Sequence, residues 1–307
     1  MRVLITGGRF IGKYLIRKLL ALNYQVFILQ RSEIAIPAQA VQFNGDIQNA
    51  QFVNDVIQQV QPEVIFHLAA CKDRQQNLKS IRQTLEVNLM GTCNIFEACS
   101  QINTLQSIIV MGTAEEYGNS ALTPFQESQR ERPISGYSLS KTCQTYLCET
   151  LARIHGLPVV VLRPSIVYGP EQGLEMFLPS LISALLKGDE YRMTLGEQTR
   201  DFIYIDDLIN AMTASMEAKN IFGQIINIGC GHSVKIGFIA EYIAGALGKA
   251  SLLKLGAIPY RKEEIFEYKI NIKKAKKLLN WAPLVSIEEG LKKTLSYYKN
   301  LKAEDYA

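Results

Sequence analysis

The chain is poor in the residues and patterns that mark several protein classes. Its three histidines, His67, His155 and His232, include no pair with two-ligand spacing on one helix, so we expect no metal site. No run of about 18 apolar residues is present, so we expect no membrane segment. Met1 leads into an apolar strand rather than into a charged leader, and we therefore expect a cytoplasmic protein.

The cysteines also argue against a stapled or metal-bound fold. The chain has six of them, without a Cys-x-x-Cys pair, and most lie in apolar helical contexts. Such cysteines usually act as small buried hydrophobic groups, so we expect free thiols in a reducing compartment.

Linkers rich in Ser and Gly, low-complexity stretches and internal repeats are absent too. The parts of the chain should therefore pack closely against one another.

The charge balance is close to neutral. Lys and Arg number 33 against 29 Asp and Glu, for a net charge of +4, which suits a small anionic ligand and does not require nucleic acid. The basic cluster at residues 273–277 has acidic residues on both sides and no aromatic ladder. We interpret this cluster as the solvated face of a helix.

Hydrophobic periodicity predicts alternating strands and helices in the first half of the chain. Near-continuous apolar strands separated by helices favour an α/β fold, here a Rossmann-type doubly wound parallel sheet whose ligands lie beyond the carboxyl ends of the strands. The expected strands are residues 3–6, 25–29, 64–68, 107–111 and 158–162, and the expected helices are residues 11–22, 51–60, 85–100 and 137–155.

The rhythm becomes less regular after Pro170, which indicates a smaller C-terminal region. There the patterns predict helices at 177–187, 234–247 and 287–301, a strand at 224–228, and a helix start near Asp207. We expect residues 1–165 to form the sheet domain, with 196–229 returning to it. Residues 166–195 and 230–307 would form the second region.

The first strand runs directly into a glycine-rich turn and a helix. This turn consists of Gly7, Gly8, Arg9, Phe10, Ile11 and Gly12. Glycines in a strand–turn–helix let the backbone approach a pyrophosphate at the helix N-terminus, so the turn predicts a dinucleotide site. The spacing is one residue shorter than G-x-x-G-x-x-G, and Arg9 stands near the expected middle glycine.

The end of the second strand indicates which dinucleotide binds. A carboxylate there favours the ribose 2′-hydroxyl of NAD, whereas an Arg accommodates the 2′-phosphate of NADP. This chain has Gln30, Arg31 and Ser32 at that place and no carboxylate. NADP is therefore favoured over NAD, with a plain surface role for Arg31 as the alternative.

Two further segments bring reactive side chains to the same sheet edge. Tyr137 and Lys141 stand one helical turn apart on one face, where a cation would depress the pKa of the phenol and make it a proton shuttle. The strand at 107–111 is followed by a turn that carries the Thr113 hydroxyl and the Glu115 carboxylate.

These motifs, in this order, resemble the extended short-chain dehydrogenase/reductase family, specifically its nucleotide-sugar epimerases, 4,6-dehydratases and 4-ketoreductases. The resemblance covers nearly the whole chain. Its further motifs are Gly45-Asp46-Ile47, His67-Leu68-Ala69-Ala70, Asn88 with Gly91-Thr92, Arg163-Pro164 through Tyr168-Gly169-Pro170, Arg200-Asp201-Phe202 and Asn227-Ile228-Gly229. One departure is Ile166, which stands where the family often has Asn.

The resemblance implies roles for individual residues. Tyr137 would be the catalytic acid/base, Lys141 would lower its pKa and hold the nicotinamide ribose, and Thr113 would hydrogen-bond the reacting sugar oxygen. The other implied cofactor contacts are Asp46 and Ile47 at the adenine, and Leu68, Ala69, Ala70, Pro164 and Val167 along the cofactor channel. Arg200 and Arg261 would bind the nucleotide diphosphate, although Glu263 and Glu264 offer Arg261 a surface ion pair instead. The helices at 85–100 and 137–155 imply a homodimer.

The expected reaction is the NADPH-dependent reduction of C4 in a nucleoside-diphosphate 4-keto-6-deoxyhexose. The alternatives are an NAD(P)-dependent 4-epimerase, or a 4,6-dehydratase in which Glu115 removes the C5 proton. Ala114 speaks against the dehydratase, since many dehydratases carry Asp or Ser there; in a reductase Glu115 would bind sugar hydroxyls. A non-catalytic NADP-binding subunit is the alternative of a different class.

Overall fold

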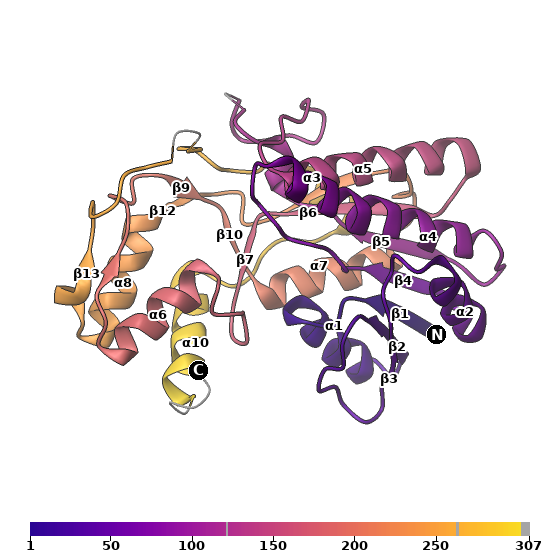
Figure 1. Cartoon of the computed structure of the whole chain (residues 1–307), viewed down its shortest axis with the longest axis horizontal. Coiled ribbons are helices and arrows are strands. Elements are labelled where there is room, and N and C mark those ends of the chain that lie inside the picture. The colour runs from indigo at the N-terminus through magenta and orange to yellow at the C-terminus, as the bar shows by residue number, and fades with distance from the viewer. Residues whose placement is uncertain (121, 262–263, 302–307) are drawn as a thin grey trace.

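The computed structural model describes residues 1–120, 122–261 and 264–301. Its centre is a parallel sheet of seven strands in the order β11-β6-β5-β4-β1-β2-β3 (Figure 1). The strands are β1 (Arg2–Thr6), β2 (Gln25–Gln30), β3 (Val41–Asn44), β4 (Val64–His67), β5 (Ser107–Met111), β6 (Val159–Pro164) and β11 (Ile225–Ile228). The expected doubly wound parallel sheet is thus confirmed.

Helices cover both faces of this sheet. Val3 and Ile5 of β1 belong to one apolar core, which they share with α1 (Phe10–Ala21) and α7 (Ile205–Glu217). Leu4 belongs to the opposite core, with α2 (Ala50–Val60), α4 (Gly91–Cys99) and α5 (Gly136–His155). Because alternate residues of a strand enter different cores, the central strands need apolar residues at every position. The edge strand β3 does not, and its mixed pattern gave no periodic signal.

The second region lies beside the sheet (Figure 1). Its helices are α6 (Phe177–Lys187), α8 (Ile236–Leu247) and α10 (Ile287–Asn300). Helix α9 (Lys273–Leu279) packs instead against β11 and α7. Three short strand pairs complete the second region: β7 (Ile166–Tyr168) with β10 (Phe202–Tyr204), β9 (Thr199–Arg200) with β12 (Val234–Lys235), and β8 (Tyr191–Arg192) with β13 (Leu253–Lys254). Between these elements the chain returns to the sheet, where β11 pairs in parallel with β6.

The helix expected at 85–100 is wrong in its start and in its regularity. Helix α3 (Leu78–Thr84) begins earlier, where the Asn77 side chain accepts a hydrogen bond from the Ser80 N–H. A π-helical turn, η1 (Leu85–Met90), follows and leads into α4. Periodicity cannot detect a π turn, because that turn changes the hydrogen-bond spacing without removing apolar residues. It contains Asn88, which is fully buried.

Three expectations from composition concern membrane helices, cysteines and the basic cluster. In the part of the chain that the structure describes, no helix combines the length and apolarity needed to cross a membrane. The six cysteines are free. Within α9, Lys273 and Lys277 are exposed while Ala275 and Leu279 are buried, so the basic cluster is a solvated helix face.

A buried histidine links the carboxyl ends of β1 and β4 to α4. The Nδ1 of His67 lies 2.7 Å from the Thr6 hydroxyl, and its Nε2 lies 2.8 Å from the Thr92 hydroxyl. Thr92 donates to the Asn88 carbonyl, so it accepts from Nε2–H, which leaves Nδ1 to accept from Thr6. Burial first, and then the charge of Lys141, lowers the pKa of His67 to about 3.

This low pKa predicts a loss of stability in mild acid. The folded state keeps His67 neutral, whereas the unfolded chain binds a proton below about pH 6.5, so stability present above that pH is lost as the pH falls toward 3. Proton uptake by His67 in the unfolded chain should therefore lower the free energy of unfolding by about 2 kcal/mol between pH 7 and pH 5. Urea unfolding of the wild type and of His67→Gln at both pH values tests this, and equal pH dependence in the two proteins would contradict it.

Candidate active site

The glycine-rich turn keeps a close backbone approach despite its shortened spacing. Gly7 has a φ of +85°, and a Cβ there would lie 2.8 Å from the backbone nitrogen of Ala69. A Cβ on Gly12 would lie 2.4 Å from the Gly7 carbonyl oxygen. Only glycine fits either place, because both contacts are with backbone atoms. The turn therefore brings β1, α1 and the residues after β4 together.

The N-terminus of α1 is suited to an anion. Arg9 is its exposed N-cap residue, no side chain caps the helix, and the first turn holds no acidic residue. The first N–H groups of α1, at the positive end of the helix dipole, are thus not occupied by a capping side chain or by an acidic residue of the first turn. With Leu68, Ala69 and Ala70 half-buried beside it, this cradle fits the pyrophosphate and body of a dinucleotide.

The end of β2 carries no carboxylate toward this cradle. Gln30 is buried, and its Oε1 accepts a 2.7 Å hydrogen bond from the Gly8 N–H, so its side chain supports the turn. Arg31 and Ser32 follow and are exposed. The Gly45 N–H donates to the Gln30 carbonyl, which places the segment after β3 beside them.

The remaining expected cofactor residues lie along the same edge of the sheet. After β3, Asp46 is half-buried, and the buried Ile47 accepts a 2.8 Å hydrogen bond from Asn94 through its carbonyl. Pro164 ends β6 and is buried, while Val167 in β7 is half-buried.

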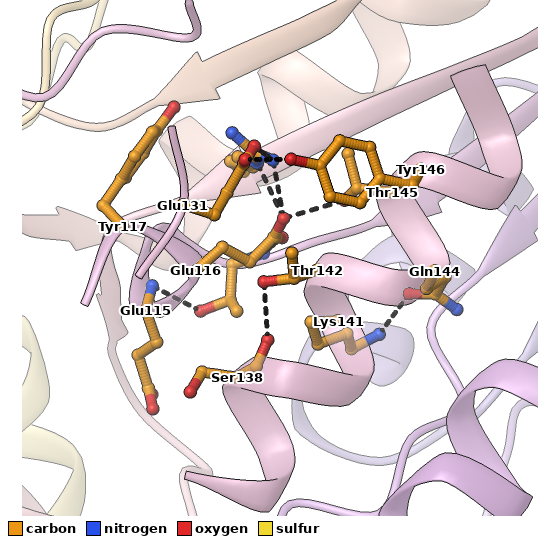
Figure 2. A network of polar contacts seen from close by, with 12 residues as sticks. Glu115, Glu116, Tyr117, Glu131, Ser138, Lys141, Thr142, Gln144, Thr145 and Tyr146 are labelled. Atoms are coloured by element: carbon orange, nitrogen blue, oxygen red, sulfur yellow. Dashed lines mark hydrogen bonds and ion pairs between the residues drawn. The ribbon is translucent and has the colours of Figure 1, made fainter. Parts of the chain in front are cut away.

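Lys141 is fully buried on α5 and is held by two acceptors. Its Nζ donates to the Met111 carbonyl at 2.7 Å and to Gln144 Oε1 at 2.8 Å (Figure 2). The Gln144 amide in turn donates to Thr92 at 2.6 Å. Burial, followed by the charge of Lys72, lowers the pKa of Lys141 to about 8, against the opposing effect of Glu116.

The phenol of Tyr137 differs from the expectation. The sequence predicts a pKa depressed by Lys141, but burial first and the Glu115 carboxylate second raise the pKa of Tyr137. Arg74 and a hydrogen bond with Thr113 act in the lowering direction. The ammonium of Lys141 is engaged by Met111 and Gln144, so it is not the main influence on the phenol.

A buried carboxylate holds the turn that carries Thr113. Glu116 accepts from the Thr113 N–H at 2.9 Å, from the Thr145 hydroxyl at 2.8 Å and from Arg163 Nε at 2.9 Å. Figure 2 shows that Glu115 points the opposite way, out of this network. The two neighbouring glutamates therefore have different tasks, and Glu116 is structural.

Glu115 is paired with Arg74, a residue that no sequence pattern indicates. Arg74, in the loop after β4, donates to it through Nε at 3.1 Å and Nη2 at 2.7 Å. The Arg74 guanidinium carbon also lies 5.2 Å from the centre of the Tyr137 ring. A lone arginine in an irregular loop carries no periodic or motif signal. Only the pairing of β4 with β5 brings it to Glu115.

The two arginines expected at the diphosphate differ in their surroundings. Arg200 forms an ion pair with Glu264 and donates to the Ile265 carbonyl at 2.6 Å. Of the two glutamates expected as alternative partners of Arg261, Glu264 thus pairs with Arg200, and Glu263 lies outside the described residues. Arg261 is exposed. Across the described ranges no group of three or more His, Cys, Asp or Glu side chains is placed to hold a metal.

The dinucleotide cradle, with Thr113, Tyr137 and Lys141 at the same sheet edge, defines a dinucleotide-dependent enzyme of the extended short-chain dehydrogenase/reductase type. A family model described as "NAD dependent epimerase/dehydratase family" matches residues 3–229. The chain belongs to this family.

Several relatives are known by activity. The chain is 30% identical to UDP-glucuronate 4-epimerase of Thermodesulfobacterium geofontis over 257 aligned residues. The aligned region covers 83% of this chain and 78% of that protein. The UDP-glucose 4-epimerase structure of Thermotoga maritima with UDP-glucose superposes with a TM-score of 0.90 at 27% identity, over 97% of this chain and 99% of that one. UDP-glucuronic acid 4-epimerase of Bacillus cereus, in complex with UDP-glucuronic acid and NAD, gives 0.87 at 30% identity, over 98% and 100%.

Gln144 should control the protonation of Lys141. In Gln144→Leu the ammonium loses one of two acceptors, worth about 1.5–3 kcal/mol for a charged donor, so the pKa of Lys141 should fall by about one unit or more. Gln144→Glu places a negative charge there and should raise it. Because Lys141 would hold the nicotinamide ribose as an ammonium, the alkaline limb of the kcat/KM profile should move to lower pH in the first variant and to higher pH in the second.

Thermal unfolding midpoints show whether each variant is folded. Identical alkaline limbs in two folded variants would refute this role of Gln144.

Proposed function

We propose that the protein reduces the C4 keto group of a nucleoside-diphosphate 4-keto-6-deoxyhexose with NADPH. The observation that carries the proposal is the end of β2. There the Gln30 side chain accepts a hydrogen bond from the Gly8 N–H, and the exposed Arg31 and Ser32 follow. A guanidinium and a hydroxyl suit a 2′-phosphate, and positions 30 to 32 hold no carboxylate to repel it. A dissociable NADPH supports net reduction, whereas epimerisation returns its hydride to the sugar.

The residues at the sheet edge would bind both reactants. The turn from Gly7 to Gly12 and the N-terminus of α1 hold the pyrophosphate. The adenosine half would contact Arg31, Ser32, Asp46 and Ile47, and the nicotinamide half would contact Leu68, Ala69, Ala70, Pro164, Val167 and Lys141. Arg200 and Arg261 would bind the sugar-nucleotide diphosphate, where guanidinium groups match phosphate geometry.

NADPH, when bound, supplies the hydride for C4. Tyr137 donates its phenolic proton to O4 as the carbonyl becomes a hydroxyl, and its raised pKa keeps that proton on the oxygen before reaction. Thr113, whose backbone is fixed by Glu116, donates a hydrogen bond to the same sugar oxygen. Lys141 orients the ribose.

A dehydratase reaction finds less support in the same geometry. Ala114 is fully buried and has no acidic group to protonate a departing hydroxyl. Glu115 already accepts three hydrogen bonds from Arg74. The 4-epimerase relatives make 4-epimerisation the second candidate, because it would use the same Thr113, Tyr137 and Lys141.

We also propose a cytoplasmic homodimer formed through the helices that carry the site. Large apolar side chains are exposed there on η1 and α5, namely Met90, Tyr146 and Ile154. Exposed large apolar side chains on these helices favour association with a second copy.

The proposal is tested with 4-keto-6-deoxyhexoses of UDP, dTDP, GDP and CDP and either reduced dinucleotide, followed by nicotinamide absorbance. NADPH consumption is expected with at least one sugar, and Tyr137→Phe should lower kcat by about 10²–10⁴-fold while the Kd for NADPH stays unchanged. A fully active Phe variant would overturn the role of Tyr137. Interconversion of UDP-hexoses without net NADPH use would establish the epimerase instead.

Arg31 provides the test of cofactor choice. Arg31→Ala removes one charged hydrogen-bond partner of the 2′-phosphate and should weaken NADPH binding by about tenfold or more, with NADH binding unchanged. Calorimetric titration of both cofactors measures the two constants. Equal weakening of both would show that Arg31 does not read the 2′-phosphate.

A further inference from the structure

Arg74 stands between the two groups that border the reacting carbonyl in the proposed function. Its guanidinium reaches both oxygens of Glu115, with Nε 3.1 Å from each and Nη2 2.7 Å from Oε1. The guanidinium carbon is 5.2 Å from the ring centre of Tyr137. The Arg74 guanidinium thus contacts both the Glu115 carboxylate and the face of the Tyr137 ring.

The loop that carries Arg74 is anchored at several points. Asn88 in the π turn accepts a hydrogen bond from the Cys71 N–H through Oδ1 at 2.7 Å. Its Nδ2 donates to the Cys71 carbonyl at 3.0 Å. The Tyr137 N–H donates to the Asp73 carbonyl at 3.1 Å. Arg74 therefore stands on a segment attached to the first turn of α5, directly beside the catalytic tyrosine.

The chemistry of a ketone gives this arrangement a consequence. Protons on the carbons next to a C4 ketone, C3 and C5, are acidic, and a free carboxylate nearby removes them: the C–H bond breaks, the proton passes to the carboxylate, and the electron pair forms an enolate with O4. Glu115 follows Thr113 by two residues, and its partner Arg74 lies 5.2 Å from the centre of the Tyr137 ring. The carboxylate therefore borders the place of the carbonyl that Thr113 and Tyr137 would serve. A reductase must suppress this side reaction.

We propose that Arg74 is a specificity-determining residue that occupies Glu115, so that the bound 4-keto sugar is reduced at C4 without proton loss at C3 or C5. The inference rests on the proposed function for its substrate. Both carboxylate oxygens accept from the guanidinium, which leaves their lone pairs poorly disposed to accept a carbon-bound proton. Arg74 also balances the negative charge of Glu115 beside the phenol.

Stability does not explain this ion pair. The side chains of Arg74 and Glu115 are 44% and 33% exposed, and pairs with that much solvent around them add little to folding free energy. Variants of Arg74 should therefore fold. Arg82 in α3, the helix that follows the Arg74 loop, forms an exposed pair with Glu86 and offers a matched control that does not contact Glu115.

The test measures deuterium uptake into the sugar rather than turnover. Each protein is incubated in D2O with NADP⁺ and the same four 4-keto-6-deoxyhexoses, and deuterium at C3 and C5 is followed by mass spectrometry and proton NMR. Arg74→Gln is expected to increase uptake by about tenfold or more over the wild type, because Glu115 is released as a base. Arg82→Gln should match the wild type.

Two further variants separate the possible results. Arg74→Gln with Glu115→Gln should return uptake to the wild-type level, and Arg74→Lys should give an intermediate rate because an ammonium cannot engage both oxygens. The inference is overturned if Arg74→Gln shows no increase with any sugar, or if the double variant still exchanges. NADPH consumption by the wild type is scored separately, so failure of the proposed reductase remains distinguishable from failure of Arg74.

Discussion

The buried carboxylate of Glu116 is the interaction on which the rest of the site depends. It joins the turn after β5, helix α5 and strand β6, through the Thr113 N–H, the Thr145 hydroxyl and the Arg163 guanidinium. Burial raises the pKa of Glu116, and Arg163 with the other donors opposes that rise. A charge this deep is tolerated only when it is paired and hydrogen-bonded, as Glu116 is with Arg163, so the network leaves its three elements little freedom. This network sets the relative positions of Thr113, on the turn, and Tyr137, on α5.

A second polar chain performs a similar task on the other side of Lys141. Gln144, Thr92 and His67 connect the ammonium to Thr6, the last residue before the glycine turn. The proposed contacts at the pyrophosphate and at the nicotinamide ribose are thus joined through these buried side chains. Such partners orient reactive groups because they leave them a single satisfied geometry.

Much of the fold could be predicted from the sequence because a doubly covered parallel sheet demands continuous apolar strands. Strand β5 was expected at the bounds observed, and α6 likewise. Prediction failed where that demand is weak or where regularity breaks. Strand β3 lies at the edge with little burial, and the π turn around Asn88 interrupts a helix that periodicity treats as uniform.

The sequence by itself determined the buried strands, most of the helices and the glycine turn, and it indicated Thr113, Tyr137 and Lys141 as candidate reactive residues, because each depends on local spacing or on residue type. Tertiary structure alone decided how those residues are partnered. Arg74 meets Glu115 because β4 and β5 are neighbours in the sheet, and Glu116 rather than Glu115 is buried because of the direction of the turn. Lys141 faces Gln144 instead of the phenol. Partners distant in sequence become neighbours only on folding, and they set the charge and proton affinity of each group.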